Sequence, residues 1–151
     1  MIEIIYPNKK VEKIEFENIC KDKKTILYFY PKDNTPGCTK EWKDFSSLKD
    51  EFEKLGYNII WVSKDSIASH EKFIEKQWLK IALISDPELV LHKKFWAWWE
   101  KKNYWRIYEW TIRSTFILDE NCNVVKEYKN VKATWHAERV LKDLKSQNEN
   151  N

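Results

Sequence analysis

The sequence has little glycine, few cysteines and no long apolar run. Of its 151 residues, two are Gly and three are Cys, at positions 20, 38 and 122. Three cysteines so far apart exclude a disulfide-rich secreted scaffold and the paired spacing of a zinc site. No stretch approaches the roughly 18 apolar residues that a membrane-spanning helix needs. Residues 1–10 also lack the pattern of a signal peptide, so we expect a cytoplasmic protein.

Charge is not gathered in any one part of the chain. The formal net charge of +3 at pH 7 is spread along the sequence, whereas a surface that binds phosphates usually has clustered Lys and Arg. We therefore expect no nucleic-acid partner and no membrane partner. A chain of this length fits one domain with a sizeable core. We predict a single domain over residues 1–151, with 146–151 as a disordered polar tail.

Short β-rich runs alternate with helical patterns along the chain. Runs of β-branched and aromatic residues predict buried strands at 25–30, 58–63 and 82–85, and a hairpin of strands at 114–119 and 124–128. Apolar spacing and capping residues predict the helices. The expected helices begin near Cys38, at Asp65 or Ser66, at Asp86-Pro87 and near Thr134. This order predicts an α/β fold, a mixed central sheet with helices on both faces.

A loop shaped by proline and glycine leads to a cysteine at the start of a helix. The first strand stops at Pro31, and Pro36-Gly37-Cys38 enters the helix, with Thr35 placed to aim its hydroxyl at the same point. Amide N–H groups in the first helical turn are unpaired and the helix dipole favours negative charge there, so a thiolate is stabilised. Position alone leaves two interpretations open: a reactive thiol, and a thiol that packs beneath the loop.

The spacing Pro31-x-x-x-Thr35-x-x-Cys38 resembles the active-site signature of the peroxiredoxins. Residues 28–39 are similar to the subfamily named for bacterioferritin comigratory protein, also called the Q group. The resemblance covers about residues 25–144 in the family's order. Further matching segments lie at 62–73, 83–87, 100–102, 113–119 and 131–141.

The resemblance implies a thioredoxin-like fold and reduction of hydrogen peroxide and organic hydroperoxides by thiols. It requires no metal, haem or flavin cofactor. Cys38 is implied as the peroxidatic cysteine, whose thiolate attacks the peroxide and becomes a sulfenic acid. Thr35 is expected to hydrogen-bond the peroxide or the thiolate. Arg113 is expected to hold positive charge beside the sulfur and to stabilise the charge that develops on the peroxide oxygens.

Substrate-binding roles are implied for three further residues. Pro31 is expected to shield and shape the pocket, and the backbone N–H groups of Gly37 and Cys38 are expected to complete it. Glu41 matches an acidic position of the family, and the resemblance implies that it orients Arg113.

The family's second thiol is missing from this chain. Many members place a resolving cysteine five residues after the first, where this chain has Lys43, and others place it on the following helix, where the match is Ile74. No family precedent carries a resolving role onto Cys20 or Cys122. We hypothesise a one-cysteine cycle in a monomer or weak homodimer. The reductant is then an external thiol, either a small thiol or a thioredoxin- or glutaredoxin-like protein.

Indole side chains are a second departure, since five of the nine Trp fall between positions 96 and 110. We favour packing around the active-site rim or lining of the pocket. An association surface is one alternative, and single-stranded nucleic acid or a membrane interface is another. The rival function is a catalytically retired module that binds a partner through this surface. The three histidines have no neighbours in sequence that suggest a metal site, and we expect surface or capping roles for them.

Overall fold

The computed structural model describes the backbone of residues 1–21, 23–33, 36–129 and 136–149. Within these ranges the side chains of 36–39, 41, 44, 103, 108, 136–137 and 147–149 are not described. The elements in chain order are β1 (Ile2–Ile5), β2 (Val11–Ile14), the 3₁₀ helix η1 (Phe16–Cys20), β3 (Lys24–Phe29), α1 (Pro36–Lys54), β4 (Tyr57–Ser63), α2 (Ile67–Gln77), β5 (Ala82–Ser85), α3 (Val90–Lys94), β6 (Trp98–Asn103), β7 (Arg106–Thr111), β8 (Ser114–Leu118), β9 (Val124–Tyr128) and α4 (His136–Glu149).

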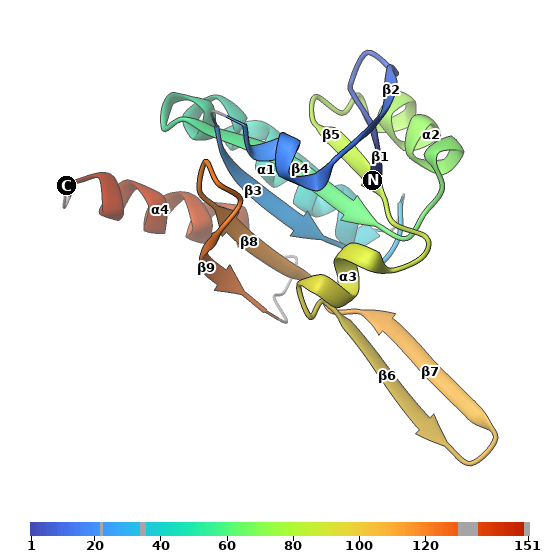
Figure 1. Ribbon diagram of the computed structural model, residues 1–151. Helices are drawn as coiled ribbons and strands as arrows, with labels where there is room; N and C mark the ends of the chain where they lie inside the picture. Colours follow the sequence, from blue (N-terminus) through green and yellow to red (C-terminus); the bar gives the residue numbers. More distant parts are fainter. Residues whose placement is uncertain (22, 34–35, 130–135, 150–151) are drawn as a thin grey trace.

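Seven strands form one mixed sheet in the order β2-β1-β5-β4-β3-β8-β9. β3, β4 and β5 run parallel to one another, and the outer strands pair antiparallel. The two parallel connections cross over through α1 and α2, as parallel strands require. β6 and β7 form a separate two-stranded ribbon that projects from the rest of the molecule (Figure 1). The predicted mixed sheet is confirmed.

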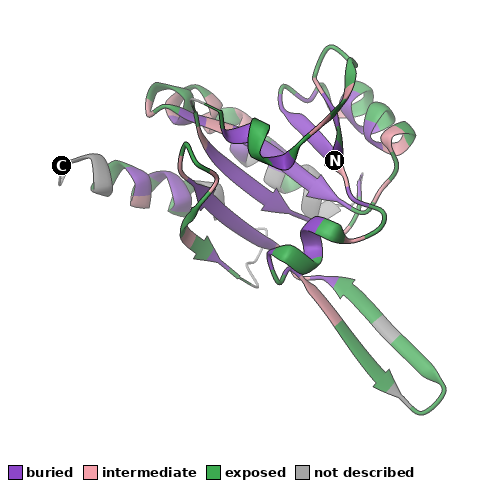
Figure 2. Cartoon of the chain, in the orientation of Figure 1, coloured by how far each residue is buried: buried purple, intermediate pink, exposed green. Residues whose placement is uncertain are grey.

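Helices cover both faces of the sheet, so the central strands are buried on both sides (Figures 1 and 2). On β3, Ile26 and Tyr28 face the core under α1, α2 and α4, while Leu27 and Phe29 face a second core under η1 and α3. Alternate residues of a strand point to opposite faces. This explains why 26–30 is continuously apolar or aromatic rather than alternating with polar residues.

Local signals placed several boundaries correctly. β5 occupies 82–85 as predicted, α1 begins with Pro36 at the first helical position, and Ser66 caps α2 by accepting the N–H of Ser69 at 3.2 Å. The third helix was predicted from Asp86-Pro87, and this prediction is wrong. α3 begins at Val90, because the Asp86 carboxylate instead accepts the N–H of His92 inside the helix at 2.9 Å.

At both ends of the chain the structure also differs from what the sequence predicted. β1 and β2 form an N-terminal hairpin on the sheet that the sequence patterns did not reveal. α4 continues to Glu149, through most of the stretch predicted as a disordered tail, and Thr134 lies outside the described residues. Among the helices described, none is both long enough and apolar enough to cross a membrane.

Candidate active site

Cys38 lies in the first turn of α1, beyond the carboxyl end of β3. It is the third residue of a 19-residue helix whose first turn contains no acidic residue. The backbone N–H groups of that turn have no partner within the helix, and the positive end of the helix dipole lies there. This position favours a thiolate at Cys38.

The loop that leads to Cys38 is anchored through one buried carboxylate, Asp33. Its side chain accepts hydrogen bonds from Tyr30 Oη at 2.5 Å and Ser69 Oγ at 2.9 Å, and it contacts His70 Nδ1 at 2.7 Å. The Asp33 N–H donates to Asp65 Oδ2 at 2.8 Å. The loop is therefore tied at Asp33 to the start of α2 and to the turn after β4.

His70 is fully buried, so the expected surface or capping role is wrong. Its Nε2 lies 2.9 Å from the carbonyl oxygen of Ile84, while Nδ1 lies against Asp33. The sequence did contain a signal for this burial. Phe73 and Ile74 follow His70 by three and four residues, which places all three on the apolar face of α2.

Asp33, Asp65 and His70 each offer one possible metal ligand, and the three atoms lie within 4.8 Å of one another. Each of these groups already has a protein partner. Asp65 Oδ2 accepts from Ser63 Oγ and from the Asp33 N–H, both at 2.8 Å. Hydrogen bonding within the chain therefore accounts for the cluster.

Arg113 lies at the same edge of the sheet, next to the strand that neighbours β3. It lies immediately before β8, which pairs antiparallel with β3 so that Phe29 faces Ser114. The Arg113 guanidinium donates from Nη1 to Tyr28 Oη at 2.6 Å. Tyr28 is fully buried and packs against Trp61 with a ring separation of 4.9 Å. The acceptor of Arg113 is therefore held rigidly in the core.

A second buried histidine anchors the segment that carries Arg113. His92 Nδ1 lies 2.7 Å from Asp86 Oδ2, and Nε2 lies 3.1 Å from Oγ1 of Thr111, two residues before Arg113. His92 is fully buried, so the surface role predicted for it is also wrong. Each buried histidine thus pairs with an aspartate and fixes one of the two segments that converge on the carboxyl end of β3.

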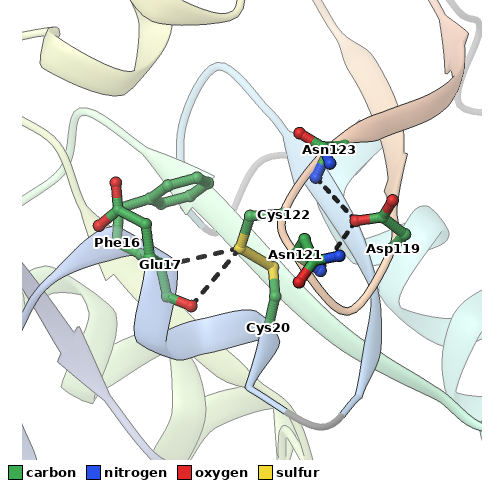
Figure 3. Close-up of a disulfide and its surroundings, with 7 residues drawn as sticks. All are labelled: Phe16, Glu17, Cys20, Asp119, Asn121, Cys122 and Asn123. Atoms are coloured by element: carbon green, nitrogen blue, oxygen red, sulfur yellow. Dashed lines mark hydrogen bonds between the residues drawn. A yellow bond between two sulfur atoms is a disulfide. The ribbon is translucent and has the colours of Figure 1, made fainter.

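Cys20 and Cys122 are joined by a disulfide at the other end of β3 (Figure 3). Their Cα atoms are 5.5 Å apart, and the bond closes a separation of 102 residues. Both pack against the core under η1 and α3, on the face of the sheet opposite α1. The six residues of β3 span about 17 Å. The pair is thus distant from the loop that leads to Cys38, and a bond spanning 102 residues has no local sequence signal.

Other side chains occupy the two positions where the family has a resolving cysteine. Lys43 is exposed on α1, and Ile74 is buried in the core beneath α2, with 4% of its surface exposed. The structure describes only some of the other predicted site residues. Pro31 lies half-buried at the end of β3, Gly37 is in the first turn of α1, the side chain of Glu41 is not described, and Thr35 lies outside the described residues.

Comparison with known proteins decides the family. A model of the AhpC/TSA family matches residues 1–127. The chain belongs to this family of peroxiredoxins. Peroxiredoxin Bcp of Bacillus subtilis strain 168 is 43% identical over 129 residues, which are 85% of this chain and 82% of the relative. Peroxiredoxin Bcp of Xanthomonas campestris is 43% identical over 121 residues, 80% of this chain and 76% of the relative.

Solved peroxiredoxins have the same fold. Xanthomonas campestris peroxiredoxin Q aligns with a TM-score of 0.84 at 36% identity, over 95% of this chain and 89% of the other. The bacterioferritin comigratory protein of the same organism, studied for its alkyl peroxide reduction activity, aligns with a TM-score of 0.84 at 35% identity over 96% and 90%. The predicted thioredoxin-like fold and subfamily are confirmed. This peroxiredoxin is a thiol-dependent peroxidase, and the retired binding module is not favoured.

Proposed function

We propose that Cys38 is the peroxidatic residue and that the enzyme works with one catalytic cysteine. The observation that carries this proposal is the placement of the three cysteines. Cys38 is in the first turn of α1, on the edge of the sheet where Arg113 is held, whereas Cys20 and Cys122 are bonded to each other at the opposite edge. The family's peroxide chemistry needs an activated thiol, and Cys38 has the electrostatic setting for one.

The reaction begins with attack of the Cys38 thiolate on one peroxide oxygen. An S–O bond forms, the O–O bond breaks, and the leaving oxygen takes a proton to depart as water or an alcohol. The sulfur is oxidised by two electrons and the peroxide is reduced by two. A first external thiol then attacks the sulfenic acid to give a mixed disulfide and water. A second thiol releases Cys38 together with the external disulfide.

Neighbouring residues have distinct roles in the first step. Arg113 supplies positive charge that favours the thiolate and the developing oxyanion. Thr35 donates a hydrogen bond to the peroxide or the thiolate, Pro31 shapes the pocket, and the N–H groups at Gly37 and Cys38 complete it. Glu41 orients Arg113. The substrates are hydrogen peroxide and organic hydroperoxides.

The reductant in this proposal is a small thiol or a thioredoxin- or glutaredoxin-like protein of the cytoplasm. Two observations support an external source. Lys43 and Ile74 occupy the positions from which the family would resolve Cys38. A disulfide also needs Cα atoms within about 7 Å, and the Cys20–Cys122 pair is separated from the Cys38 segment by the length of β3 and by the sheet itself.

Peroxide consumption driven by dithiothreitol tests the assignment. Wild type and a Cys20→Ala/Cys122→Ser variant are expected to be active at similar rates, and Cys38→Ser is expected to be inactive. Activity in Cys38→Ser would refute the nucleophile. Mass spectrometry after one equivalent of peroxide should find the sulfenic acid on Cys38. A disulfide from Cys38 to Cys20 or Cys122 would refute the one-cysteine cycle. It would not contradict the assignment of Cys38 as the nucleophile.

A further inference from the structure

The β6–β7 ribbon exposes aromatic side chains that its own fold does not use. Tyr104 and Trp105, at the turn, are each 97% exposed, and Ile107 beside them is 59% exposed. The ribbon carries this turn away from the body of the molecule (Figures 1 and 2). Packing around the active-site rim, the role favoured from the sequence, is therefore wrong for Trp105. We call residues 101–107 the ribbon tip.

Other contacts of the ribbon account for its stability without the tip. Trp99 and Trp110 face each other across the two strands, with ring centres 3.6 Å apart. At the base, Trp98 packs against His92 at 5.9 Å and under the ammonium group of Lys64 at 5.5 Å. These three indoles hold the strands together and to the body. The two aromatic residues of the turn take no part in these contacts.

The turn contains large aromatics where short hairpin loops usually have glycine or asparagine. Tyr104 and Trp105 are the two residues that connect Asn103 to its partner Arg106. Tyr104 has a φ of 54°, in the left-handed region that bulky side chains rarely adopt. The exposed side chain of Tyr104 contributes no burial that would offset this unfavourable backbone conformation. This indicates that the side chain acts in binding.

Charge along the ribbon is divided between tip and base. Lys101, Lys102 and Arg106 are exposed and lie within the three pairs of residues nearest the turn. The acidic pair Glu100 and Glu109 comes next, about 10 Å from the last pair before the turn at the rise of a strand. The outermost 10 Å of the ribbon therefore carries the cations, the turn aromatics and the exposed Ile107, and its sequence contains no acidic residue.

We propose that the ribbon tip docks on an anionic lipid surface. Tyr and Trp favour the boundary between headgroups and acyl chains because each has an apolar ring and a polar N–H or O–H group. Lysine and arginine beside them are attracted to anionic headgroups. The acidic pair stays outside the headgroup layer, where it is not repelled at close range. This proposal replaces the sequence-based expectation of no membrane partner. It goes beyond the peroxidase activity and does not depend on which residue attacks the peroxide.

A nucleic acid fits the ribbon less well. Single-stranded nucleic acid stacks successive bases on aromatic faces along a basic groove, but the rings of Trp99 and Trp110 are stacked on each other. Only the turn would remain for bases. The lipid surface, which needs two interfacial aromatics and adjacent cations, matches what the tip exposes.

Flotation of the full chain with vesicles tests the proposal. We expect binding to vesicles of phosphatidylcholine with phosphatidylglycerol, weaker binding to phosphatidylcholine alone, and loss of binding at high salt. Tyr104→Ser/Trp105→Ser is expected to weaken partitioning about tenfold or more, and Lys101→Gln/Lys102→Gln about tenfold. Trp fluorescence of the wild type should shift to the blue on binding.

Matched controls separate the tip from general surface effects. Trp78→Ser removes an indole that is 84% exposed on the body, and Lys72→Gln/Lys76→Gln removes two exposed charges from α2. Both are expected to bind vesicles like the wild type, and the Tyr104→Ser/Trp105→Ser variant should keep its melting temperature and its activity on hydrogen peroxide. Absence of binding to anionic vesicles, or equal losses in the controls, would overturn the proposal. If the protein bound a labelled single-stranded oligonucleotide and only the tip variants lost this binding, the tip would be a nucleic-acid site instead. If the protein formed a dimer in gel filtration and only the tip variants lost it, the tip would be a dimer contact instead.

Discussion

His70 and Asp33 form a buried contact in which the imidazole has an acceptor on each side. Nδ1 lies 2.7 Å from Asp33 Oδ2, and Nε2 lies 2.9 Å from the carbonyl oxygen of Ile84. The ring therefore bridges the Asp33 side chain and the Ile84 carbonyl through its two nitrogens, and His70 is fully buried. The pair links β5 and α2 to the loop that leads to Cys38. Asp33 precedes Cys38 by five residues, and we expect the pair to help position the candidate nucleophile.

Replacing His70 by Gln should lower both stability and activity. The change removes a fully buried hydrogen-bonding partner of Asp33 and of the Ile84 carbonyl, and leaving buried polar groups unsatisfied typically costs about 1–3 kcal/mol of unfolding free energy for each group. Loosening of the loop should lower kcat/KM by about tenfold to a hundredfold at unchanged temperature. Urea unfolding and peroxide kinetics measure the two effects.

Ser69→Ala is the matched control for His70→Gln. It removes one neutral hydrogen bond to Asp33 from the same turn and should cost about 1 kcal/mol. A positioning role also predicts that Asp33→Asn lowers the rate of Cys38 oxidation across the whole pH range. If His70→Gln and Ser69→Ala lowered stability and rate equally, the particular importance of the His70 contact would be refuted.

Tyr28→Phe should slow the reaction with peroxide without removing any charge. The change deletes the oxygen that accepts from Arg113 at 2.6 Å and leaves the guanidinium less well placed, for which we expect about a tenfold loss in kcat/KM. Arg113→Gln, which removes the charge, should lose about a hundredfold or more. It should also move the half-maximal rate to higher pH, because a nearby positive charge favours the thiolate.

Tyr128→Phe is the control for Tyr28→Phe. Tyr128 is another buried tyrosine, and it donates to Asp143 at 2.5 Å between β9 and α4. Burial and the hydrogen bond to Asp143 raise the pKa of Tyr128. Its replacement should affect stability and leave kcat/KM unchanged, so an equal loss of activity in the two variants would contradict the specific role of Tyr28.

The Cys20–Cys122 bond should stabilise the fold substantially. It closes a loop of about a hundred residues, and cross-links of that span contribute about 3–5 kcal/mol by restricting the unfolded chain. Reduction should lower the urea midpoint of the wild type and leave that of Cys20→Ala/Cys122→Ser unchanged. Alkylation in denaturant should find one free thiol, Cys38, before reduction and three after. Three free thiols before reduction would show that the bond does not form.

Acid should weaken the turn that carries Cys122. The backbone N–H groups of Asn123 and Asn121 donate to the Asp119 carboxylate and hold its pKa below the ordinary value of 3.8. A depressed pKa contributes stability that is present above about pH 4 and is lost as the pH falls through the folded-state value. The isosteric Asp119→Asn variant lacks this contribution. The difference in melting temperature between wild type and variant should therefore shrink between pH 6 and pH 2, and a constant difference would contradict the assignment.

Local sequence determined much of the frame around the candidate site. Pro36-Gly37-Cys38 specifies a helix start because proline fits the first helical position, and Ser66 specifies another because its hydroxyl reaches a free N–H three residues on. The apolar run of 26–30 specifies a strand buried on both faces. These features depend on neighbours within a few residues, so the sequence alone was enough to predict them. The role of Cys38 stays a prediction from the family motif.

Tertiary structure alone decided how the segments near the candidate site are held. The Asp33 partner of His70 is 37 residues away and the Tyr28 partner of Arg113 is 85 residues away, so only tertiary structure brings these groups together. The same is true of Cys20 and Cys122, 102 residues apart. Whether an indole packs or projects depends on where the β6–β7 ribbon leaves the body, which no local spacing encodes. The sequence determined what kind of enzyme this is. The fold determined how the segment at Asp33 is held and which side chains the β6–β7 ribbon exposes.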